Sequence, residues 1–475
     1  MISDRPADTT LAELRVGGYR PRSVKEEMRS NLLELIRRRA PLLPGILGYD
    51  ETVLPQIENA ILAGQDVILL GERGQAKSRI ARSLVDLLDV WVPAVAGAEL
   101  HDDPFRPVSP FARAVITELG DATPVTWIGR HERYSEKLAT PDITIADLIG
   151  EVDPVKVAEG RYLSDELTIH YGLLPRTHRG IFALNELPDL AERIQVGLLN
   201  VMEERDVQIR GYRIRLELDL FVIASANPED YTSRGRIITP LKDRFGAQIR
   251  THYPDEAATE IAIMEAEARE FAGDEPAAPP AVEVQVPSFM KEIVAELSQL
   301  ARRSSEVSQR SGVSVRVTIS NHETLAATAL KRAVRLGEPT AAPRISDLPA
   351  VVASTAGKIE LETLGDETRE DRVVEKLVAR SVVNVFNRHY ALSELVALIE
   401  AFEAGVEAEV GESAPSDHHG ELVESLPELR RAIASLDVGE SPAGIASGVE
   451  FVLEGLHLNR RLNKERRGGG VRYAR

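Results

Sequence analysis

The 475-residue chain contains no cysteine. This absence excludes disulfide bonds, cysteine-ligated zinc, iron–sulfur clusters and thiol catalysis. It is consistent with a reducing compartment, and we expect a cytoplasmic protein. Aromatic residues make up only 5% of the chain. The hydrophobic cores must therefore consist mainly of Leu, Ile, Val and Ala, a composition that suits a helix-rich protein.

Long apolar runs are also lacking. The longest, such as residues 67–70, are far shorter than the ~20 residues that a transmembrane helix needs. Residues 1–10 are polar and contain no apolar stretch, which predicts no signal peptide. We therefore expect a protein that does not associate with membranes.

Positive charge is scarce relative to negative charge. The chain has 57 Lys and Arg against 75 Asp and Glu, which gives a net charge of −18. An acidic surface repels phosphate backbones, so the balance argues against nucleic-acid binding by the body of the protein. Basic residues gather in residues 460–475, which we interpret as a solvated tail. Contact between this tail and an acidic partner or RNA is the alternative.

The pattern of residues predicts several structural parts. Residues 1–44 are predicted to form an N-terminal helical arm, in which Ser23 caps a helix whose apolar face includes Leu32 and Ile36. Residues 272–285 are rich in Ala and Pro and are predicted to be a linker. Residues 286–362 and 363–475 show helical patterns, with a loop expected at residues 411–420.

Residues 45–271 alternate short apolar runs with helical segments. Predicted strands cover residues 66–70, 181–184 and 220–224, and predicted helices cover residues 78–88 and 190–204. Such an alternation indicates an α/β domain with a mostly parallel sheet covered on both faces. Between residues 207 and 216 the apolar period changes to two around Gly211, which indicates a β-hairpin.

A phosphate-binding loop follows the first of these strands. Glycines allow backbone N–H groups to curl around phosphate oxygens, and the helix that follows adds partial positive charge. In this loop Lys77 is expected to bridge the β- and γ-phosphates of ATP, and the Ser78 hydroxyl to bind Mg²⁺. The predicted nucleotide-binding residues are Gly71, Glu72, Arg73, Gly74, Gln75, Ala76, Lys77 and Ser78.

One position of this loop departs from the usual pattern GxxxxGK[ST]. Ala76 takes the place of the last glycine. A methyl group at this position is tolerated where φ is negative and is costly where φ is positive. The substitution therefore predicts weaker nucleotide binding than a loop with glycine. The alternative interpretation is a glycine-rich turn that binds nothing.

A second polar position follows the strand at residues 181–184. The usual pair there is Asp-Glu, in which Asp holds Mg²⁺ through water and Glu polarises the attacking water. Asn185 takes the Asp position and Glu186 keeps the position of the base. Asn is neutral, so the affinity for the metal should fall, although its carbonyl oxygen can still accept a bond from a water ligand.

Three further residues complete a candidate ATPase site. Asn227 follows the strand at residues 220–224 and is expected to orient the attacking water, with a turn-forming Asn-Pro as the alternative. Arg244 is a candidate arginine finger for the γ-phosphate of a neighbouring subunit. Arg316, at the start of a predicted helix, is a candidate for the same phosphate, although a single Arg is more often a solvated residue.

Together these residues resemble the AAA+ ATPase subunit of magnesium chelatase and its MoxR relatives over residues 45–350. The resemblance extends beyond the phosphate-binding loop to His101-Asp102-Asp103-Pro104, to residues 147–153 of a helix-2 insert and to residues 171–181 before the second strand. The hairpin at residues 207–216 stands where this family has its pre-sensor-1 insertion.

The resemblance implies a fold and an assembly. The fold is an AAA+ P-loop core with a mostly parallel sheet flanked by helices, followed by a helical lid and here a helical C-terminal extension. Asn227 would be sensor 1, Arg244 the arginine finger and Arg316 sensor 2. The family implies a homo-oligomeric ring, usually a hexamer, because an arginine finger acts on the next subunit. It also implies a partner with a von Willebrand A domain, since the Asp-x-Ser-x-Ser motif of that domain does not occur in this sequence.

Four functions stay open. The first is a motor that hydrolyses ATP to remodel a protein partner, and Glu186, Asn227 and Arg244 favour it. The second is a nucleotide-binding ring scaffold with little hydrolysis, which Ala76 and Asn185 favour. A transcription activator of the enhancer-binding class would need a Gly-Ala-Phe-Thr-Gly-Ala loop, which is absent. The ATPase subunit of a magnesium or cobalt chelatase would need partner subunits to bind the tetrapyrrole.

Overall fold

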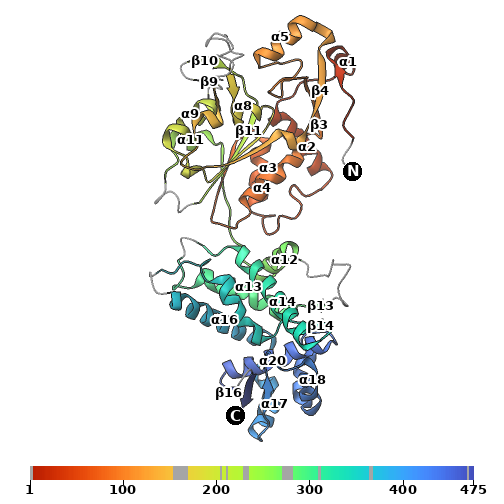
Figure 1. The fold of residues 1–475 in the computed structure, drawn as a ribbon, viewed down its shortest axis with the longest axis vertical. Coiled ribbons are helices and arrows are strands. Elements are labelled where there is room, and N and C mark those ends of the chain that lie inside the picture. The colour runs from red at the N-terminus through yellow and green to blue at the C-terminus, as the bar shows by residue number, and fades with distance from the viewer. Residues whose placement is uncertain are drawn as a thin grey trace. The chain divides into compact units, whose positions relative to one another are not determined.

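The computed structural model describes residues 4–152, 169–203, 206–209, 212–227, 235–269, 282–308, 312–362, 367–467 and 470–475. The chain divides into two compact units, Met1–His252 and Tyr253–Arg475 (Figure 1). Most of the predicted linker at residues 272–285 lies outside the described residues. The predicted domain boundaries therefore stay predictions.

A five-stranded parallel sheet forms the centre of the first unit. Its strands are β2 (Val67–Leu70), β5 (Tyr134–Leu138), β8 (Gly180–Asn185), β11 (Leu220–Ala226) and β12 (Ala247–Arg250). The spatial order is β12-β2-β11-β8-β5, and every neighbouring pair is parallel. The predicted α/β core is confirmed. Because β11 lies between β2 and β8, the ends of three strands that are distant in sequence meet at one edge.

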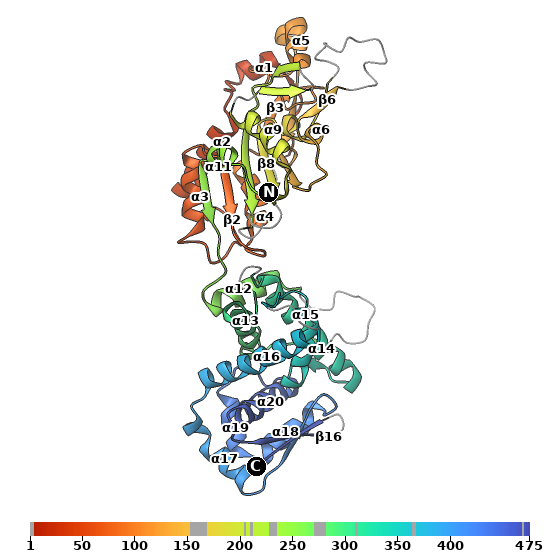
Figure 2. The same ribbon diagram turned by 90° about the vertical axis from the view of Figure 1, so that its left-hand side faces the viewer.

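Helices cover both faces of this sheet (Figure 2). On one face α2 (Val24–Arg37), α3 (Val53–Leu62) and α4 (Lys77–Ser83) share a hydrophobic cluster with the strands. On the other face lie α6 (Ile145–Leu148), α8 (Leu173–Arg176), α9 (Glu192–Glu203) and α11 (Thr239–Arg244). Val67 and Leu69 belong to the first cluster and Ile68 to the second, as the alternation of side chains along a strand requires.

The N-terminal helix α2 is part of the first of these layers. The Ser23 side chain accepts a hydrogen bond from the Glu26 backbone N–H, so Ser23 caps the helix as predicted. Val24, Met28 and Leu32 are fully buried in the cluster on the sheet. Residues predicted to form an arm thus pack on the core of the first unit.

Smaller elements surround the sheet. An antiparallel sheet contains β1 (Thr9–Thr10), β4 (Pro124–Gly129) and β3 (Trp91–Val95), with α1 (Leu11–Val16) and α5 (Pro110–Leu119) nearby. Strands β6 (Gly150–Val152) and β7 (Ile169–Tyr171) form a second antiparallel pair. Strands β9 (Asp206–Ile209) and β10 (Tyr212–Arg215) form a third, in the region of the predicted hairpin. The hairpin's Gly211 lies outside the described residues.

A buried ion pair joins α2 to the segment just before β5. Arg133 donates two hydrogen bonds to the Glu27 carboxylate at 2.8 and 2.7 Å, and both side chains are almost completely buried. The Arg133 Nε atom also donates to the Arg179 carbonyl at 2.7 Å. A Cβ atom at Gly180 would lie 2.0 Å from the Arg133 carbonyl oxygen, so only glycine fits there. The segment before β8 is therefore constrained by packing.

The second unit is mostly helical. Its helices are α12 (Ala257–Glu267), α13 (Ser288–Arg303), α14 (Val315–Leu336), α15 (Val351–Thr355), α16 (Glu367–His389), α17 (Val396–Glu403), α18 (Ser416–Ser425), α19 (Pro427–Ala434) and α20 (Pro442–Leu458), with a short parallel pair of β13 (Glu283–Val284) and β14 (Thr340–Ala341). None of the helices in the described part of the chain is long and apolar enough to cross a membrane.

One hydrophobic core runs through this unit. Phe289 of α13 stacks on Phe451 of α20 with ring centroids 4.3 Å apart, and Phe386 of α16 meets the same ring edge-on at 5.8 Å. A Cβ atom at Gly455 would lie 2.0 Å from the Phe386 ring, so α16 and α20 approach closely there. The predicted lid at 286–362 and the predicted extension at 363–475 thus share one core.

The prediction of a solvated basic tail is wrong. Strands β16 (Asn463–Arg467) and β17 (Gly470–Ala474) pair antiparallel, and β17 also pairs with β15 (Ala408–Val410). Val471 and Tyr473 alternate with Arg472, so one face of β17 packs on the core and Arg472 forms ion pairs on the other. The C-terminal extension therefore contains a small sheet besides its helices.

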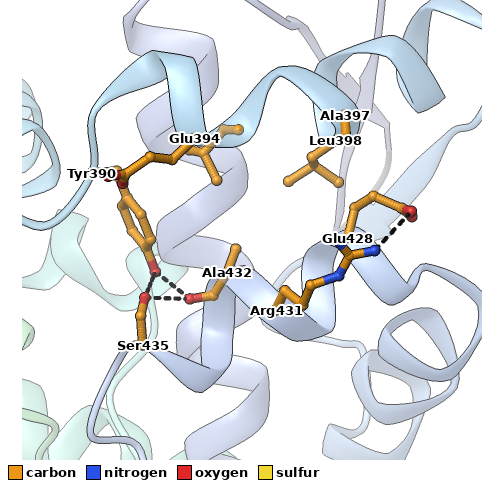
Figure 3. Close-up of a pocket in the computed structure, with 9 residues that line it drawn as sticks. Tyr390, Glu394, Ala397, Leu398, Glu428, Arg431, Ala432 and Ser435 are labelled. Carbon is orange, nitrogen blue, oxygen red and sulfur yellow. Dashed lines mark hydrogen bonds and ion pairs between the residues drawn. The ribbon is translucent and has the colours of Figure 1, made fainter.

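A cavity of about 190 Å³ lies beside α17 and α19 (Figure 3). The Tyr390 hydroxyl at its wall donates to the Ala432 carbonyl at 2.7 Å, and Ser435 donates to the same oxygen at 2.7 Å. Glu428 and Arg431 form an ion pair at 3.6 Å. These polar groups make contacts within the fold, and burial raises the pKa of Tyr390 to about 12.

We predict that Glu27→Gln destabilises the first unit. The change leaves Arg133 as a buried cation without its counter-charge, a loss that costs about 3–5 kcal/mol in buried pairs. Urea denaturation followed by tryptophan fluorescence reports on this unit, because Trp91 and Trp127, the chain's two tryptophans, both lie in it. Asp121→Asn, which breaks an exposed pair with Arg15, should change the free energy of unfolding by less than about 1 kcal/mol. Equal effects would contradict the prediction.

Candidate nucleotide-binding site

The predicted phosphate-binding loop connects β2 to α4. The Gly71 backbone N–H donates to the Ala226 carbonyl at 3.1 Å, which joins the loop to the end of β11. A Cβ atom at Gly71 would lie 1.9 Å from Thr251 Oγ1 and 2.2 Å from Gln75 Oε1, so a larger residue there would displace both side chains. Gln75 Oε1 accepts hydrogen bonds from the Glu72 N–H at 2.9 Å and the Thr251 hydroxyl at 2.7 Å. These bonds hold the loop against the residue that follows β12.

Ala76 adopts the conformation in which its methyl group is costly. Its φ is 57° and its ψ is 11°, in the left-handed region. Gly74, two residues earlier, has a φ of 75°. An L-residue with a Cβ atom costs roughly 1–2 kcal/mol there. The loop thus keeps the backbone conformation that glycine favours, although Ala76 is strained in it.

The predicted lysine lies at the centre of the site. Lys77 is only 7% exposed. Its ammonium donates to the carbonyl oxygens of Gly71 and Glu72 at 2.5 and 2.7 Å, and to Asn227 Oδ1 at 2.7 Å. The strand order thus brings together two predicted site residues that are 150 positions apart in the sequence.

Asn227 continues this chain of hydrogen bonds to the predicted base. Its Nδ2 atom donates to Glu186 Oε2 at 2.9 Å. Because an ammonium only donates and a carboxylate only accepts, the two neighbours fix the orientation of the Asn227 amide. Glu186 has a φ of 55° and a ψ of 47°, and strained backbones of this kind concentrate at functional sites. Lys77, Asn227 and Glu186 therefore form one connected group.

The two predicted metal-binding residues also meet. Ser78 Oγ donates to Asn185 Oδ1 at 3.4 Å, and Ser225 Oγ donates to the same oxygen at 3.2 Å. On its other side, Asn185 Nδ2 donates to Glu136 Oε1 at 2.5 Å. The neutral residue at position 185 is thus hydrogen-bonded directly to a carboxylate.

Glu136 is a residue that the sequence analysis missed. It lies on β5, the strand next to β8, and is 49 residues before Asn185. Arg82 of α4 donates to both of its oxygens at 2.7 and 2.9 Å, and these bonds lower the pKa of the Glu136 carboxyl below its usual range. The only sequence signal was a short polar segment, which is typical of an edge strand and carries no apolar pattern.

The donor set at this edge suits Mg²⁺ bound with a nucleotide. It consists of the Ser78 hydroxyl and the Asn185 amide carbonyl, both oxygens of the kind that Mg²⁺ prefers. Within the described ranges, no group of three or more His, Cys, Asp or Glu side chains could hold a metal alone. Such a site would therefore need phosphate oxygens and water as further ligands, which is usual for Mg²⁺.

The two predicted arginines lie in different units. Arg244 ends α11 and forms an ion pair with Glu203 at the end of α9, in which both side chains are 39% exposed. The hydrogen bond from Arg244 lowers the pKa of Glu203. Arg316, near the start of α14, belongs to the second unit, so its predicted role at the nucleotide stays a prediction.

A cavity of about 430 Å³ adjoins the loop. Ligands of open parallel sheets bind at the carboxyl ends of the strands, where this cavity lies. Lys242 and Arg250 give part of its wall a positive charge. Its lining residues are Leu70, Gly71, Glu72, Gln75, Lys242, Arg250 and Thr251.

Comparison with known proteins agrees with this geometry. No family model matches the chain. The magnesium-chelatase subunit ChlI of Oryza sativa subsp. indica is 30% identical over 48% of this chain and 54% of its own length. ChlI-1 of Arabidopsis thaliana is 28% identical over 48% and 52%. The matched part of this chain is an AAA+ module similar to that of the magnesium-chelatase I subunit. It spans about half the length of these curated relatives.

Solved structures similar to this AAA+ protein were also found. A putative ATPase from Cytophaga hutchinsonii is 17% identical, with a TM-score of 0.30 over 77% of this chain and 97% of its own. A chain from a complex of magnesium-chelatase subunits BchI and BchD is 19% identical, with a TM-score of 0.34 over 70% and 98%. Because these TM-scores are low, the fold assignment rests on the strand order and on the sequence relatives.

We predict that Ala76→Gly stabilises the AAA+ module. Glycine adopts the left-handed conformation without the steric cost of a Cβ atom, so the free energy of unfolding should rise by about 1 kcal/mol. The control is Ala81→Gly in α4, where glycine should instead lower stability by about 1 kcal/mol. Urea denaturation followed by tryptophan fluorescence compares the two variants. A loss of stability in both would show that Ala76 is not strained.

Proposed function

We propose that this chain binds ATP with Mg²⁺ at the loop between β2 and α4 and hydrolyses it. The observation that carries the proposal is the continuous hydrogen-bonded group of Lys77, Asn227 and Glu186 at the carboxyl edge of the sheet. A phosphate-binding loop alone needs only the lysine. The additional carboxylate and the amide that positions it are what a hydrolytic reaction requires.

Each residue has a distinct task in this proposal. Phosphate oxygens would replace the loop carbonyls as partners of the Lys77 ammonium, which stabilises the charge that develops on the phosphates. The Glu186 carboxylate would polarise the attacking water. Asn227 would fix the positions of that carboxylate and of the Lys77 ammonium relative to each other through its two hydrogen bonds. Mg²⁺ would neutralise phosphate charge beside Ser78 and Asn185.

We further propose that the active site is completed by a neighbouring subunit. Arg244 ends a helix and its side chain is 39% exposed, so it is available to a second copy after leaving Glu203. A head-to-tail contact of this kind generates a closed ring, and we propose a hexamer. The relatives are named as subunits of magnesium chelatase, which supports a motor that remodels a partner protein, with one carrying a von Willebrand A domain as our candidate.

A nucleotide-binding scaffold with little hydrolysis is the second candidate. The left-handed Ala76 favours it, because strain in the loop lowers affinity for phosphate. The neutral Asn185 favours it as well, because it lacks the charge that binds the cation. The names of the relatives also leave open a chelatase ATPase subunit, for which tetrapyrrole-binding partners would be required.

We predict that the rate of ATP hydrolysis per subunit rises with protein concentration. Arg244→Ala should lower the rate by about 10³-fold or more, since arginine fingers contribute 10³–10⁵-fold in related NTPases. Arg193→Ala, which removes an exposed arginine of α9, is the matched control and should leave the rate unchanged. Steady-state phosphate release with Mg²⁺ measures all three proteins.

Glu186→Gln separates the two candidates. For a motor, this variant should bind ATP as the parent does but lose turnover, because glutamine cannot act as the base. Phosphate release and ATP binding are measured on the same preparation. A parent protein that binds ATP and shows no hydrolysis at any concentration would support the scaffold instead.

A further inference from the structure

The candidate cation position carries a neutral side chain. Ser78 and Asn185 meet there with their oxygens 3.4 Å apart. A divalent cation on nucleotide phosphates is held more tightly when a carboxylate is nearby. Asn185 offers a carbonyl dipole but no charge, and the serines at 78 and 225 are neutral as well. On these three side chains alone, Mg²⁺ should add little to nucleotide affinity.

The structure shows a carboxylate directly behind Asn185. Glu136 accepts a hydrogen bond from Asn185 Nδ2 at 2.5 Å, and its side chain is 20% exposed. It reaches this position because β5 pairs in parallel with β8, with Glu136 opposite Ala183 and Leu138 opposite Asn185. The negative charge therefore stands one strand further out than the usual Asp.

We propose that Glu136 supplies the negative charge that Asn185 lacks and acts through the Asn185 amide to position Mg²⁺ bound to the nucleotide. This inference rests on the proposed function. Glu136 is a positioning residue, because the amide stands between it and the cation. Where the usual site has a single Asp carboxylate, this chain has the Asn185 amide with the Glu136 carboxylate behind it.

The hydrogen bonds around Asn185 support this assignment. An ionised carboxylate only accepts, so Glu136 turns the Nδ2 end of the amide toward itself and the Oδ1 end toward Ser78. A charge-assisted bond to Nδ2 also polarises the amide and makes Oδ1 a better acceptor. Partners of this kind orient metal-binding groups, and their loss typically weakens metal affinity.

Arg82 raises a simpler explanation, in which Glu136 only fastens α4 to β5. The Arg82 side chain is 65% exposed, and its charge is therefore screened by water more than that of Glu136. The two explanations predict opposite effects of removing Arg82 on Mg²⁺ binding. If the pair is only structural, removing either partner has the same effect. If Glu136 attracts the cation, removing Glu136 weakens Mg²⁺ binding, whereas removing Arg82 preserves or strengthens it.

The test measures how much Mg²⁺ increases nucleotide affinity. The full chain is titrated with a fluorescent ADP analogue with Mg²⁺ and with EDTA, and the ratio of the two dissociation constants is the Mg²⁺ effect. Glu136→Gln keeps an acceptor for Asn185 but removes the charge, and should lower the Mg²⁺ effect about 10- to 100-fold, with affinity in EDTA unchanged. Arg82→Gln should keep or raise the effect.

Two further variants make the result specific. Glu99→Gln removes a carboxylate from a half-exposed pair with Arg176 and should leave the Mg²⁺ effect unchanged. The double variant Glu136→Gln with Asn185→Asp moves the charge to position 185 and reverses the hydrogen bond between the two side chains. It should restore the Mg²⁺ effect that Glu136→Gln loses. Melting temperatures confirm that each variant is folded.

The outcomes separate this inference from the function on which it rests. If the parent binds no nucleotide under either condition, the proposed function fails and the role of Glu136 fails with it. If the parent shows a Mg²⁺ effect that Glu136→Gln retains, or that Glu136→Gln and Arg82→Gln lose equally, only the role of Glu136 is overturned. Loss in Glu136→Gln alone, with recovery in the double variant, supports it.

Discussion

The position of β11 between β2 and β8 is the constraint on which the candidate site depends. Parallel strands in this order place their carboxyl ends side by side, so the residues that follow each strand meet at one edge. Lys77 follows β2 through the loop, Glu186 follows β8 and Asn227 follows β11. Without this order, the hydrogen bonds of Asn227 to the lysine and to the glutamate could not form.

Two charges at this edge, those of Lys77 and Glu136, are compensated by specific partners. The Lys77 ammonium is surrounded by carbonyl oxygens, and the Glu136 carboxylate is held by Arg82 and Asn185. Ala76 and Glu186, with left-handed backbones, lie in the segments that follow β2 and β8. Local strain is retained there because the surrounding strands and hydrogen bonds fix the backbone.

The sequence predicted the core of the first unit well because its strands are short apolar runs followed by turn-forming or polar residues. It also predicted a site at Lys77, Ser78, Asn185, Glu186 and Asn227 from their positions after the strands, and the structure places these residues at one edge of the sheet. It missed β5 and β12, the two edge strands of the sheet, because edge strands are short and carry more charged residues than central ones. Glu136 was missed with β5. The prediction of a solvated tail was wrong because Val471 and Tyr473, which pack on the core, lie among many charged residues in the sequence.

The sequence by itself was enough to predict a phosphate-binding loop, the strands beside it and the two departures at positions 76 and 185, because these are properties of neighbouring residues. The tertiary structure decided the rest. It showed that Ala76 is left-handed, that Asn227 joins Lys77 to Glu186, and that Asn185 is bonded to Glu136. These facts depend on strand order and register, which join residues as far apart in sequence as Lys77 and Asn227 and which no local pattern encodes.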